Sequence, residues 1–442
     1  MKIAFKTHSI LFAILFTGMP IQSYAGNLAD IYALAKRQDT GLQIAIANYN
    51  ASAQQHPIAR ASLLPQVSAN VNTSDTSQKI DGQTFNVSGG DIDFNTHGYG
   101  ATLTQALYHH DFYVQLRQAK NAVAKAQVEL DNARQDLIVR VAQVYFDVLA
   151  AQDNVRFAEA EKKSFGRQLE QAETRFEVGL IAITDVKEAQ ASYDLAVSRE
   201  IDANTALSLA IDALAVVTGE RLEELKVLSE NMQLLRPDPD DVQTWIDRAL
   251  DQNLTLLASE YDTRIAAQEI KLRRSGHLPT VDIVGSYNDS DTGSLTGSRR
   301  TKTSQIGLEL NLPILAGGRT YYQTKEARHL HSVALNTLES QRRETVRLTR
   351  DSFLNVVSGI SRVKALGVAV ESAEAAAEAT QAGFDVGTRT SVDVLVALRT
   401  VFEAQRDYSR SKYDYLLNTL RLKQATGLLN ADDLLQINDW LE

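Results

Sequence analysis

The stretch VGLIAITDV, residues Val178–Val186, interrupts a long helical sequence, and a near copy, VGTRTSVDV, stands at Val386–Val394. The two copies align without a gap at an offset of 208 residues, and both begin with Val-Gly and end with Asp-Val. Glycine adopts positive φ without a steric penalty, so each copy can end one helix and turn the chain into the next. The doubled stretch therefore predicts two helix–turn–helix tips in one chain, at residues 178–186 and 386–394.

The repeat extends well beyond the tips. The segment LLPQV at Leu63–Val67 corresponds to HLPTV at His277–Val281, more than one hundred residues before each tip. Self-similarity over such a distance indicates two copies of one structural unit. We expect residues 26–239 and 240–442 to be two structural repeats, each with a helix, two strands, a long helix, a tip, a second helix and an equatorial segment.

A long helix precedes each tip. No proline occurs between Phe112 and Val178, and apolar residues recur from Leu116 to Ala158 at a mean spacing of 3.5, which is typical of a coiled-coil seam. At a rise of about 1.5 Å per residue, this helix would extend for about 100 Å. The second repeat predicts a similar helix from about Tyr321 to Phe384. By itself this pattern also fits a plain helical rod or bundle.

Four short segments alternate apolar and polar residues, as strands with one apolar face do. They are predicted at about residues 65–75, 97–108, 279–288 and 303–313. Such strands suit a membrane β-barrel, and they also suit a soluble, half-buried sheet. Four strands are too few to close a barrel, and an open edge is not tolerated in lipid, so a barrel would require several copies.

The composition and the N-terminal segment argue for an exported protein and against several classes of function. Residues 1–25 carry Lys2 and Lys6, an apolar run and Ser23-Tyr24-Ala25, which together predict a secretory signal peptide. Its removal changes the formal charge from −10 to −12, which argues against a nucleic-acid partner. The chain has no cysteine, hence no disulfides, and no transmembrane helix is expected beyond the signal. No catalytic motif or cofactor site is predicted, so an exported enzyme is not favoured.

Around the tips, the segments RFEVGLIAITDVKEAQASYD from Arg175 and GFDVGTRTSVDVL from Gly383 resemble the TolC family of Gram-negative outer-membrane channels. The resemblance covers nearly all of the mature chain. It implies a homotrimer, mainly α, in which each chain gives four strands to one twelve-stranded membrane β-barrel. A coiled-coil α-helical tunnel would continue into the periplasm. A small mixed α/β equatorial region would come from residues 219–240 and the tail after 427.

The resemblance also implies a function. The chain would form a passive exit duct in the cell outer membrane, for multidrug efflux and type I protein secretion. The duct would open at its periplasmic tips on docking with a periplasmic adaptor protein and an inner-membrane transporter of the RND, ABC or MFS class. The alternative is a periplasmic coiled-coil adaptor, although adaptors carry lipoyl-like domains that the four strands do not resemble.

The resemblance further assigns a gate to the tips. Asp393 matches a pore-facing aspartate, so three copies would form a carboxylate ring at the constriction that favours cations and could bind a multivalent one. Arg389 matches an arginine that ties neighbouring tip helices together, with Asp185 and Thr184 as its partners. No other metal site and no cofactor is implied.

Two positions depart from the family pattern. Phe384 stands where the family has a tyrosine, so a hydroxyl hydrogen bond toward Asp185 is unavailable. Val396 stands where the family has a second pore aspartate. We expect one carboxylate ring instead of two, and a less tightly latched gate.

The tips have a functional and a plain structural interpretation. Their Val-Gly-containing segments match the family's adaptor-contact motif, namely Val178, Gly179 and Leu180 in the first tip and Val386, Gly387 and Thr388 in the second. The plain interpretation is helix capping, in which helices begin at Asp185, with Glu188 completing a capping box, and at Ser391 as an N-cap. Elsewhere, His109 and His110 are a weak metal candidate without a third ligand nearby.

Overall fold

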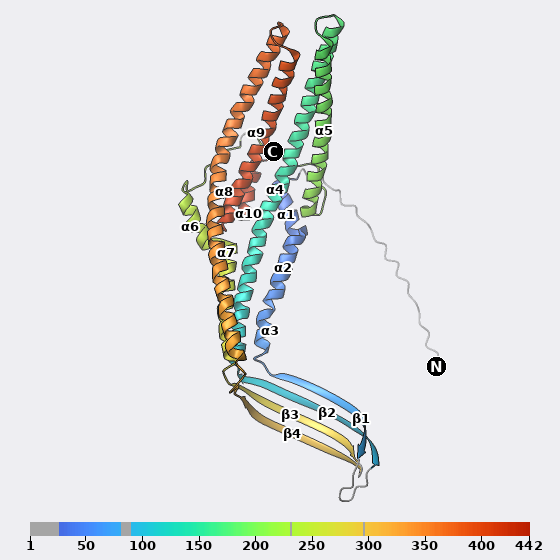
Figure 1. The fold of residues 1–442 in the computed structure, drawn as a ribbon, viewed down its shortest axis with the longest axis vertical. Helices are drawn as coiled ribbons and strands as arrows, with labels where there is room; N and C mark the ends of the chain where they lie inside the picture. Colours follow the sequence, from blue (N-terminus) through green and yellow to red (C-terminus); the bar gives the residue numbers. More distant parts are fainter. Residues whose placement is uncertain (1–25, 81–89, 230–231, 295–296) are drawn as a thin grey trace, which may run out of the picture.

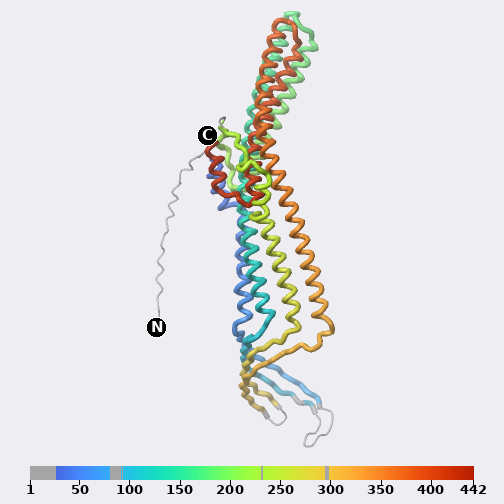
Figure 2. Tube along the Cα trace, turned by 90° about the vertical axis from the view of Figure 1, so that its left-hand side faces the viewer, coloured from blue at the N-terminus to red at the C-terminus, as the bar shows by residue number. Residues whose placement is uncertain are grey.

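The computed structural model describes residues 26–80, 90–229, 232–294 and 297–442 (Figure 1). The predicted signal peptide, residues 1–25, lies outside these ranges. The chain is elongated, with a β-sheet at one end, two helical hairpin tips at the other and long helices between them (Figures 1 and 2). The sheet and the tips are therefore separated by the full length of the helices.

The sheet is antiparallel and follows the chain order: β1 (Gln66–Ile80), β2 (Gly90–Tyr108), β3 (Thr280–Ser294) and β4 (Gly297–Asn311). All four strands lie where the alternation predicts them, but they extend further from the helices, into segments predicted as polar loops. Pairs such as Ser77 with Asp93 continue the ladder there. The bounds from sequence were too short because backbone amides form the ladder, whereas the pattern detects only apolar side chains.

One face of the sheet is apolar and uncovered. The register places Val67 opposite Leu103, Leu103 opposite Gly285 and Gly285 opposite Ile306, so these positions share a face. On this face Val71 is 85% exposed and Leu308 is 71% exposed. The outer strands β1 and β4 have no further strand partner within the described residues. An apolar face between two open edges suits a barrel that other copies complete in lipid.

Two long helices dominate the rest of the chain. These are α4 (His110–Glu177), with 68 residues, and α8 (Arg319–Asp385), with 67. Each folds back at its tip into a shorter partner, α5 (Ile183–Thr218) or α9 (Ser391–Ala425). At about 1.5 Å per residue, α4 is about 100 Å long. The long helices predicted from the coiled-coil spacing are confirmed.

Shorter helices accompany the long ones between the equator and the sheet. They are α2 (Thr40–Ala53), α3 (Gln55–Ala61) and α7 (Leu254–Ser275). The first two pack on α4, and α7 packs on both α4 and α8 (Figure 2). In each repeat, therefore, helices precede and follow the strand pair along the chain.

By length and composition, α5 and α8 could each cross a membrane, because each contains an 18-residue window of mean hydropathy 1.4. This differs from the expectation of no such helix. A window average tolerates an isolated charged residue, whereas the search for a continuous apolar run does not. Only 22% of either window is buried within the single chain, so most of this apolar helix surface is open to a neighbour.

A small equatorial region surrounds the middle of the helices. It contains α1 (Leu28–Gln38), α6 (Val242–Gln252), α10 (Ala431–Asn438) and two isolated β-bridges, Gly26 with Leu225 and Leu228 with Leu441. The main hydrophobic core lies here, and its largest fully buried side chains include Tyr145, Phe146 and Tyr415. The mixed region implied by the resemblance is thus present, with α10 and the β-bridge of Leu228 with Leu441 in the predicted segments, whereas α1 and α6 lie outside them.

Candidate functional site at the helix tips

The first tip is a Schellman motif at the end of α4. The Leu180 N–H donates to the Arg175 carbonyl at 2.9 Å, and the Gly179 N–H donates to the Phe176 carbonyl at 2.9 Å. Gly179 has φ +78°, in the left-handed region that this motif requires. The Val-Gly-Leu segment therefore ends the helix and satisfies two of its terminal carbonyls.

The second tip repeats this geometry at the end of α8. The Thr388 N–H donates to the Gly383 carbonyl at 2.8 Å, the Gly387 N–H donates to the Phe384 carbonyl at 3.1 Å, and Gly387 has φ +81°. A Cβ at either tip glycine would meet no other atom within 4 Å. The requirement for glycine is therefore conformational and does not come from crowding.

The two returning helices begin differently from each other and from the expectation. Helix α5 begins at Ile183 with Ala182 as its N-cap, and no side chain caps it. The predicted start at Asp185, with a Glu188 capping box, is wrong. Asp185 instead lies in the first turn, where its negative charge interacts favourably with the positive end of the helix dipole. Ile183 and Thr184, which precede the aspartate, are already helical. The Asp185 and Glu188 pair resembles a capping box in sequence and therefore indicated a later start.

Helix α9 begins with a complete capping box. Thr390 is its N-cap, where Ser391 was predicted, and the Asp393 N–H donates to Thr390 Oγ1 at 3.2 Å. In return, Asp393 Oδ2 accepts from the Thr390 N–H and from its hydroxyl, each at 2.9 Å. These hydrogen bonds, with Arg389 nearby, hold the pKa of the Asp393 carboxyl below its ordinary value of 3.8. Asp393 therefore stays ionised and holds the start of the helix.

Of the proposed latch residues, Arg389 and Thr184 are exposed and Asp185 is partly buried, and these three are not joined within one chain. Within the described residues, the Arg389 guanidinium forms no ion pair, and neither Thr184 nor Asp185 makes a side-chain hydrogen bond. The aliphatic part of Arg389 lies against Gly383, where a Cβ would come within 2.8 Å of its Cγ. The charged end of Arg389 is thus free to reach beyond the chain.

A contact between the two hairpins was not found by sequence reasoning. The Arg175 guanidinium of α4 lies over the Phe384 ring of α8, with Cζ at 4.3 Å from the ring centroid. One of its nitrogens, Nη2, is 3.5 Å from Asp385 Oδ1. The only signal in the sequence is that these residues occupy the last turn of each long helix.

Further toward the equator, charged side chains join α4 to the second hairpin. Glu161 is fully buried and accepts from Arg199 of α5 and, at 3.2 Å, from Arg406 of α9. Asp147 pairs with Arg410 of α9 at 2.8 Å. In the sequence Glu161 is indistinguishable from a charge on a solvated helix face, because only the packing of three helices buries it.

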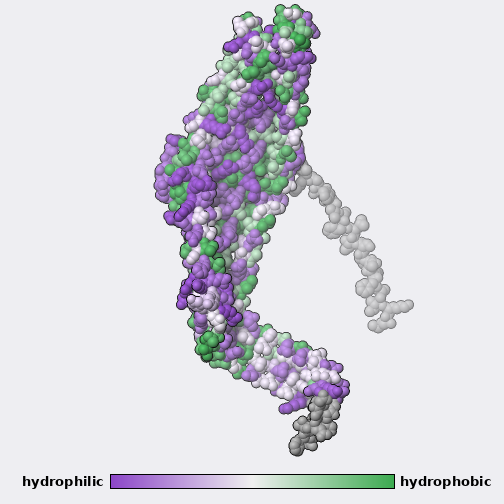
Figure 3. All heavy atoms as spheres, viewed as in Figure 1, coloured by the Kyte–Doolittle hydropathy of each residue, from purple (hydrophilic) through white to green (hydrophobic). Residues whose placement is uncertain are grey.

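The tips also carry exposed apolar side chains. Val178 is 67% exposed, Leu180 73% and Val386 76%. Figure 3 shows hydrophobic surface at the end of the molecule that carries the tips. Thr388 is also exposed, and Val396 is exposed in α9 beyond its first turn. Apolar side chains that are exposed together form the kind of surface that other proteins contact.

Polar side chains also gather at two places away from the tips. His109 pairs with Asp282 at 3.0 Å and stacks on Phe112. No group of three His, Cys, Asp or Glu side chains that could hold a metal ion occurs within the described ranges.

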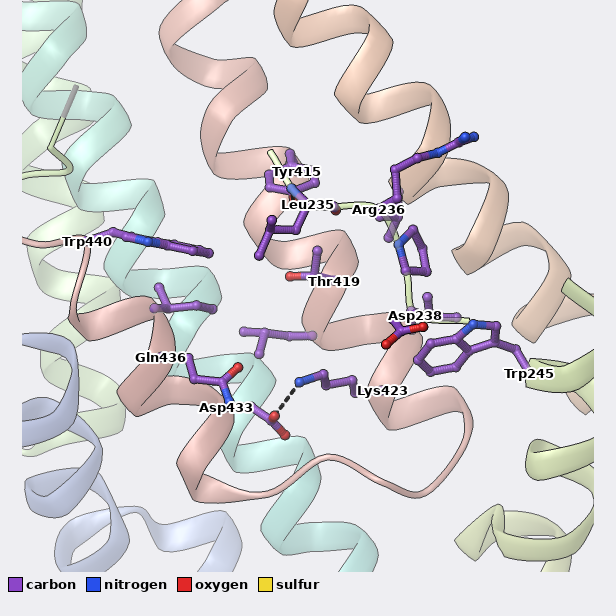
Figure 4. Close-up of a pocket in the computed structure, with 15 residues that line it drawn as sticks. Leu235, Arg236, Asp238, Trp245, Tyr415, Thr419, Lys423, Asp433, Gln436 and Trp440 are labelled. Carbon is purple, nitrogen blue, oxygen red and sulfur yellow. Dashed lines mark hydrogen bonds and ion pairs between the residues drawn. The ribbon is translucent and has the colours of Figure 1, made fainter. Parts of the chain in front are cut away.

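At the equator, a pocket is lined by Trp245, Trp440 and the Lys423–Asp433 ion pair (Figure 4). The Tyr415 hydroxyl donates to the Leu235 carbonyl at 2.8 Å beside it. The polar contacts of this pocket join α9, α10 and the loop before α6.

Comparison with known proteins identifies the family. The sequence profile named Outer membrane efflux protein matches residues 31–220 and 245–428. The chain is 36% identical to Outer membrane protein TolC of Vibrio cholerae serotype O1, covering 95% of this chain and 94% of that protein. It is 29% identical to the alkaline protease secretion protein AprF of Pseudomonas aeruginosa, covering 93% and 86%.

A solved structure shows the same fold. The CmeC outer membrane channel of Campylobacter jejuni superposes with a TM-score of 0.80 at 18% identity, covering 94% of this chain and 90% of that one. Channels of this family are trimeric outer-membrane components that work with other transporters, and the matched relatives are channel proteins rather than enzymes. The periplasmic adaptor alternative is not supported. The chain therefore belongs to the TolC family of outer membrane efflux proteins, and it is a channel of the Gram-negative outer membrane for efflux and type I secretion.

Proposed function

We propose that three copies of this chain form one continuous passive duct, which docks at its tips with a periplasmic adaptor and an inner-membrane transporter of the RND, ABC or MFS class. The observation that carries this proposal is the four-stranded sheet with two open edges and an exposed apolar face. Three such sheets would close a twelve-stranded barrel in lipid, and each would continue into helices about 100 Å long. Each copy would contribute two helical hairpins, one from each of the repeats 26–239 and 240–442, so that six hairpins surround one axis.

The test of assembly is direct. Outer-membrane fractions of cells that express the chain should contain a trimer that resists heating in detergent. A monomer found in the soluble periplasmic fraction would contradict the duct.

We propose that Asp393 forms the pore constriction of this duct. Its carboxylate is ionised and lies at the start of α9, next to the tip. Three such carboxylates around one axis would attract cations and could hold a multivalent one. Because Val396 replaces the second family aspartate, one ring is proposed. Single-channel recordings should show reduced cation selectivity and reduced block by trivalent cations in Asp393→Asn, and unchanged values would refute the ring.

The latch is proposed to lie between chains. Arg389 is exposed and has no ion-pair partner in its own chain among the described residues, while Asp185 and Thr184 are unengaged on the other hairpin. A contact from Arg389 to Asp185 and Thr184 of a neighbouring copy would satisfy all three groups. Arg389→Ser should then raise single-channel conductance, and an unchanged conductance would show that this contact does not hold the closed state.

The adaptor is proposed to bind the exposed tip residues. These are Val178, Gly179 and Leu180 in the first tip, and Val386, Gly387 and Thr388 in the second. The glycines expose backbone that another helix could approach closely, and the valines supply apolar area. Because the chain has no native cysteine, single Cys substitutions at Leu180 and Thr388 would report cross-links to an adaptor tip without background.

The cargo is proposed to be both small toxic molecules and secreted proteins. The relatives include a protein named for alkaline protease secretion, which supports the second class. Deletion of the gene, with comparison of drug sensitivity and the secreted proteome, would separate the two. A deletion that changes neither would overturn the proposal.

A further inference from the structure

We propose that Arg175 is a latch residue that fastens the second hairpin to the first within one chain, by covering Phe384 and pairing with Asp385. This proposal rests on the tip gate proposed above, because it concerns what holds that gate closed. It adds a contact inside the chain to the contact proposed between chains at Arg389.

The geometry of the three residues supports a specific contact. The guanidinium Cζ is 4.3 Å from the Phe384 centroid, within the range in which a cation is attracted to a ring face. Phe384 is only 7% exposed although it stands in the last turn before a loop, and the Arg175 side chain is 26% exposed. Phe384, which lacks the hydroxyl of the family's tyrosine, therefore contacts the Arg175 guanidinium through its ring face.

The position of Asp385 indicates that its partner is on the other hairpin. It is the last residue of α8, where the helix dipole presents partial negative charge and a carboxylate is disfavoured. Gln381 donates to Asp385 Oδ1 at 3.1 Å, and the Arg175 guanidinium 3.5 Å from the same oxygen supplies the only positive charge paired with it among the described residues. The charge of Asp385 is thus offset by α4 and not by its own helix.

The same arrangement is absent from the first tip. In the alignment of the repeats, Arg175 corresponds to Gly383 and Glu177 to Asp385. Within the described residues Glu177 has no ion pair. The cation therefore comes only from the first hairpin and the acid only from the second, so the pair joins the two hairpins in one direction.

This contact is also the outermost polar fastening between the hairpins. The charged links from α4 to α9 end at Glu161 and Arg406, which lie about 23 Å of helix from the tips. Beyond that level, the polar links from α4 to the second hairpin within the described residues are Gln168 to Gln381, at 3.0 Å, and Arg175 to Asp385. Movement of the second tip away from the first must break the Arg175 contact before any deeper one.

The test uses the full-length trimer in planar lipid bilayers. Arg175→Gln keeps side-chain length but removes the charge, Phe384→Leu keeps apolar volume but removes the ring, and Asp385→Asn removes the acid. We expect each to raise single-channel conductance, with a shift of the closed-to-open ratio of roughly fivefold to tenfold for Arg175→Gln. The exchanged pair, Arg175→Glu with Asp385→Arg, should return conductance toward the wild-type value.

The matched control is Asp147→Asn, which breaks an ion pair of similar exposure between α4 and α9 far from the tip. Heat-resistant trimer bands confirm that each variant has assembled. Conductance that rises in Arg175→Gln and not in Asp147→Asn supports the latch. An equal rise in both would mean general loosening and would overturn it. If Arg389→Ser raises conductance and all three tip variants leave it unchanged, this inference fails and the proposed gate stands. If none of them, Arg389→Ser included, changes conductance, both fail.

Discussion

Glu161 of α4 and Arg406 of α9 form an ion pair at 3.2 Å, although 245 residues separate them in the chain. The same carboxylate, which is fully buried, also accepts from Arg199 of α5. Three helices from both repeats therefore meet at one acidic side chain.

Removal of this charge should destabilise the helical part of the channel. Glu161→Gln leaves two arginines without their buried counter-charge, and the expected loss is about 3–5 kcal/mol per chain. Urea-induced dissociation of the detergent-solubilised trimer would measure it. The control is Glu159→Gln, an exposed neighbour on the same helix, which should change stability by no more than about 0.5 kcal/mol. Equal midpoints for the two variants would show that the buried triad contributes nothing.

Substitutions at Gly387 should separate helix termination from adaptor binding. Gly387→Ala places a Cβ at φ +81°, which costs about 1–2 kcal/mol through backbone conformation, since no atom lies close enough to clash. Gly387→Asn should cost less, because asparagine tolerates left-handed geometry. Thermal dissociation of the trimer would show the order Gly, Asn, Ala.

The same pair of variants tests docking. If the bare glycine surface is needed by the adaptor, Gly387→Asn should lose drug export while keeping trimer stability close to the wild type. Full export by Gly387→Asn would assign the glycine to helix termination alone.

The start of α9 should depend on pH through Asp393. The folded-state pKa of this carboxyl lies below 3.8, so its contribution to stability is complete above that value and is lost as the pH falls through the folded pKa. The protection of the first-turn amides of α9 against hydrogen exchange, relative to their intrinsic rates, should therefore stay constant down to about pH 4 and decrease below it.

The control for this pH dependence is Asp393→Asn, compared with the wild type at each pH so that intrinsic exchange rates cancel. Asparagine can accept the Thr390 hydrogen bonds but does not titrate. A wild-type curve that parallels the curve of the Asp393→Asn variant throughout would contradict a role for the carboxylate in the cap.

The apolar face of the sheet should be sensitive to charge in a way that its other face is not. Leu308→Arg would place a cation on the face that carries Val67 and Ile306, at a cost of about 2–4 kcal/mol if that face meets the middle of the bilayer. Gln305→Arg changes the opposite face of the same strand. Only Leu308→Arg should reduce the amount of trimer in the outer membrane. Equal loss from both substitutions would refute the assignment of the faces.

Local patterns in the sequence were sufficient for the elements of the fold. The 3.5-residue spacing predicted α4 and α8, and the alternation predicted all four strands. These signals are strong because a helix seam or a sheet face repeats the same physical requirement many times. The strand ends were predicted too short because their outer halves pair through the backbone while carrying polar side chains on both faces.

Signals at single positions were less reliable. The glycines of both tips were identified correctly, since left-handed geometry restricts the residue type. The start of α5 was placed at Asp185 instead of Ile183, because Ala182 caps that helix without a side-chain hydrogen bond. Helix α9 does begin at Ser391, but its N-cap is Thr390 and not the serine. A cap depends on one or two hydrogen bonds, so neighbouring polar residues are nearly equivalent in sequence.

The sequence by itself determined that this chain has two repeats, two glycine-ended tips, two helices near 100 Å and four alternating strands, and its motifs indicated the channel family. Only the tertiary structure decided which side chains of the two hairpins meet. Arg175 contacts Phe384 and Asp385 because the tip ends of α4 and α8 lie next to each other. Glu161 pairs with Arg199 and Arg406 because α4 also packs against α5 and α9. Periodicity reports which face of a helix is buried, but the partner across that face depends on the relative rotation and register of two helices, which are set by the packing of the whole molecule.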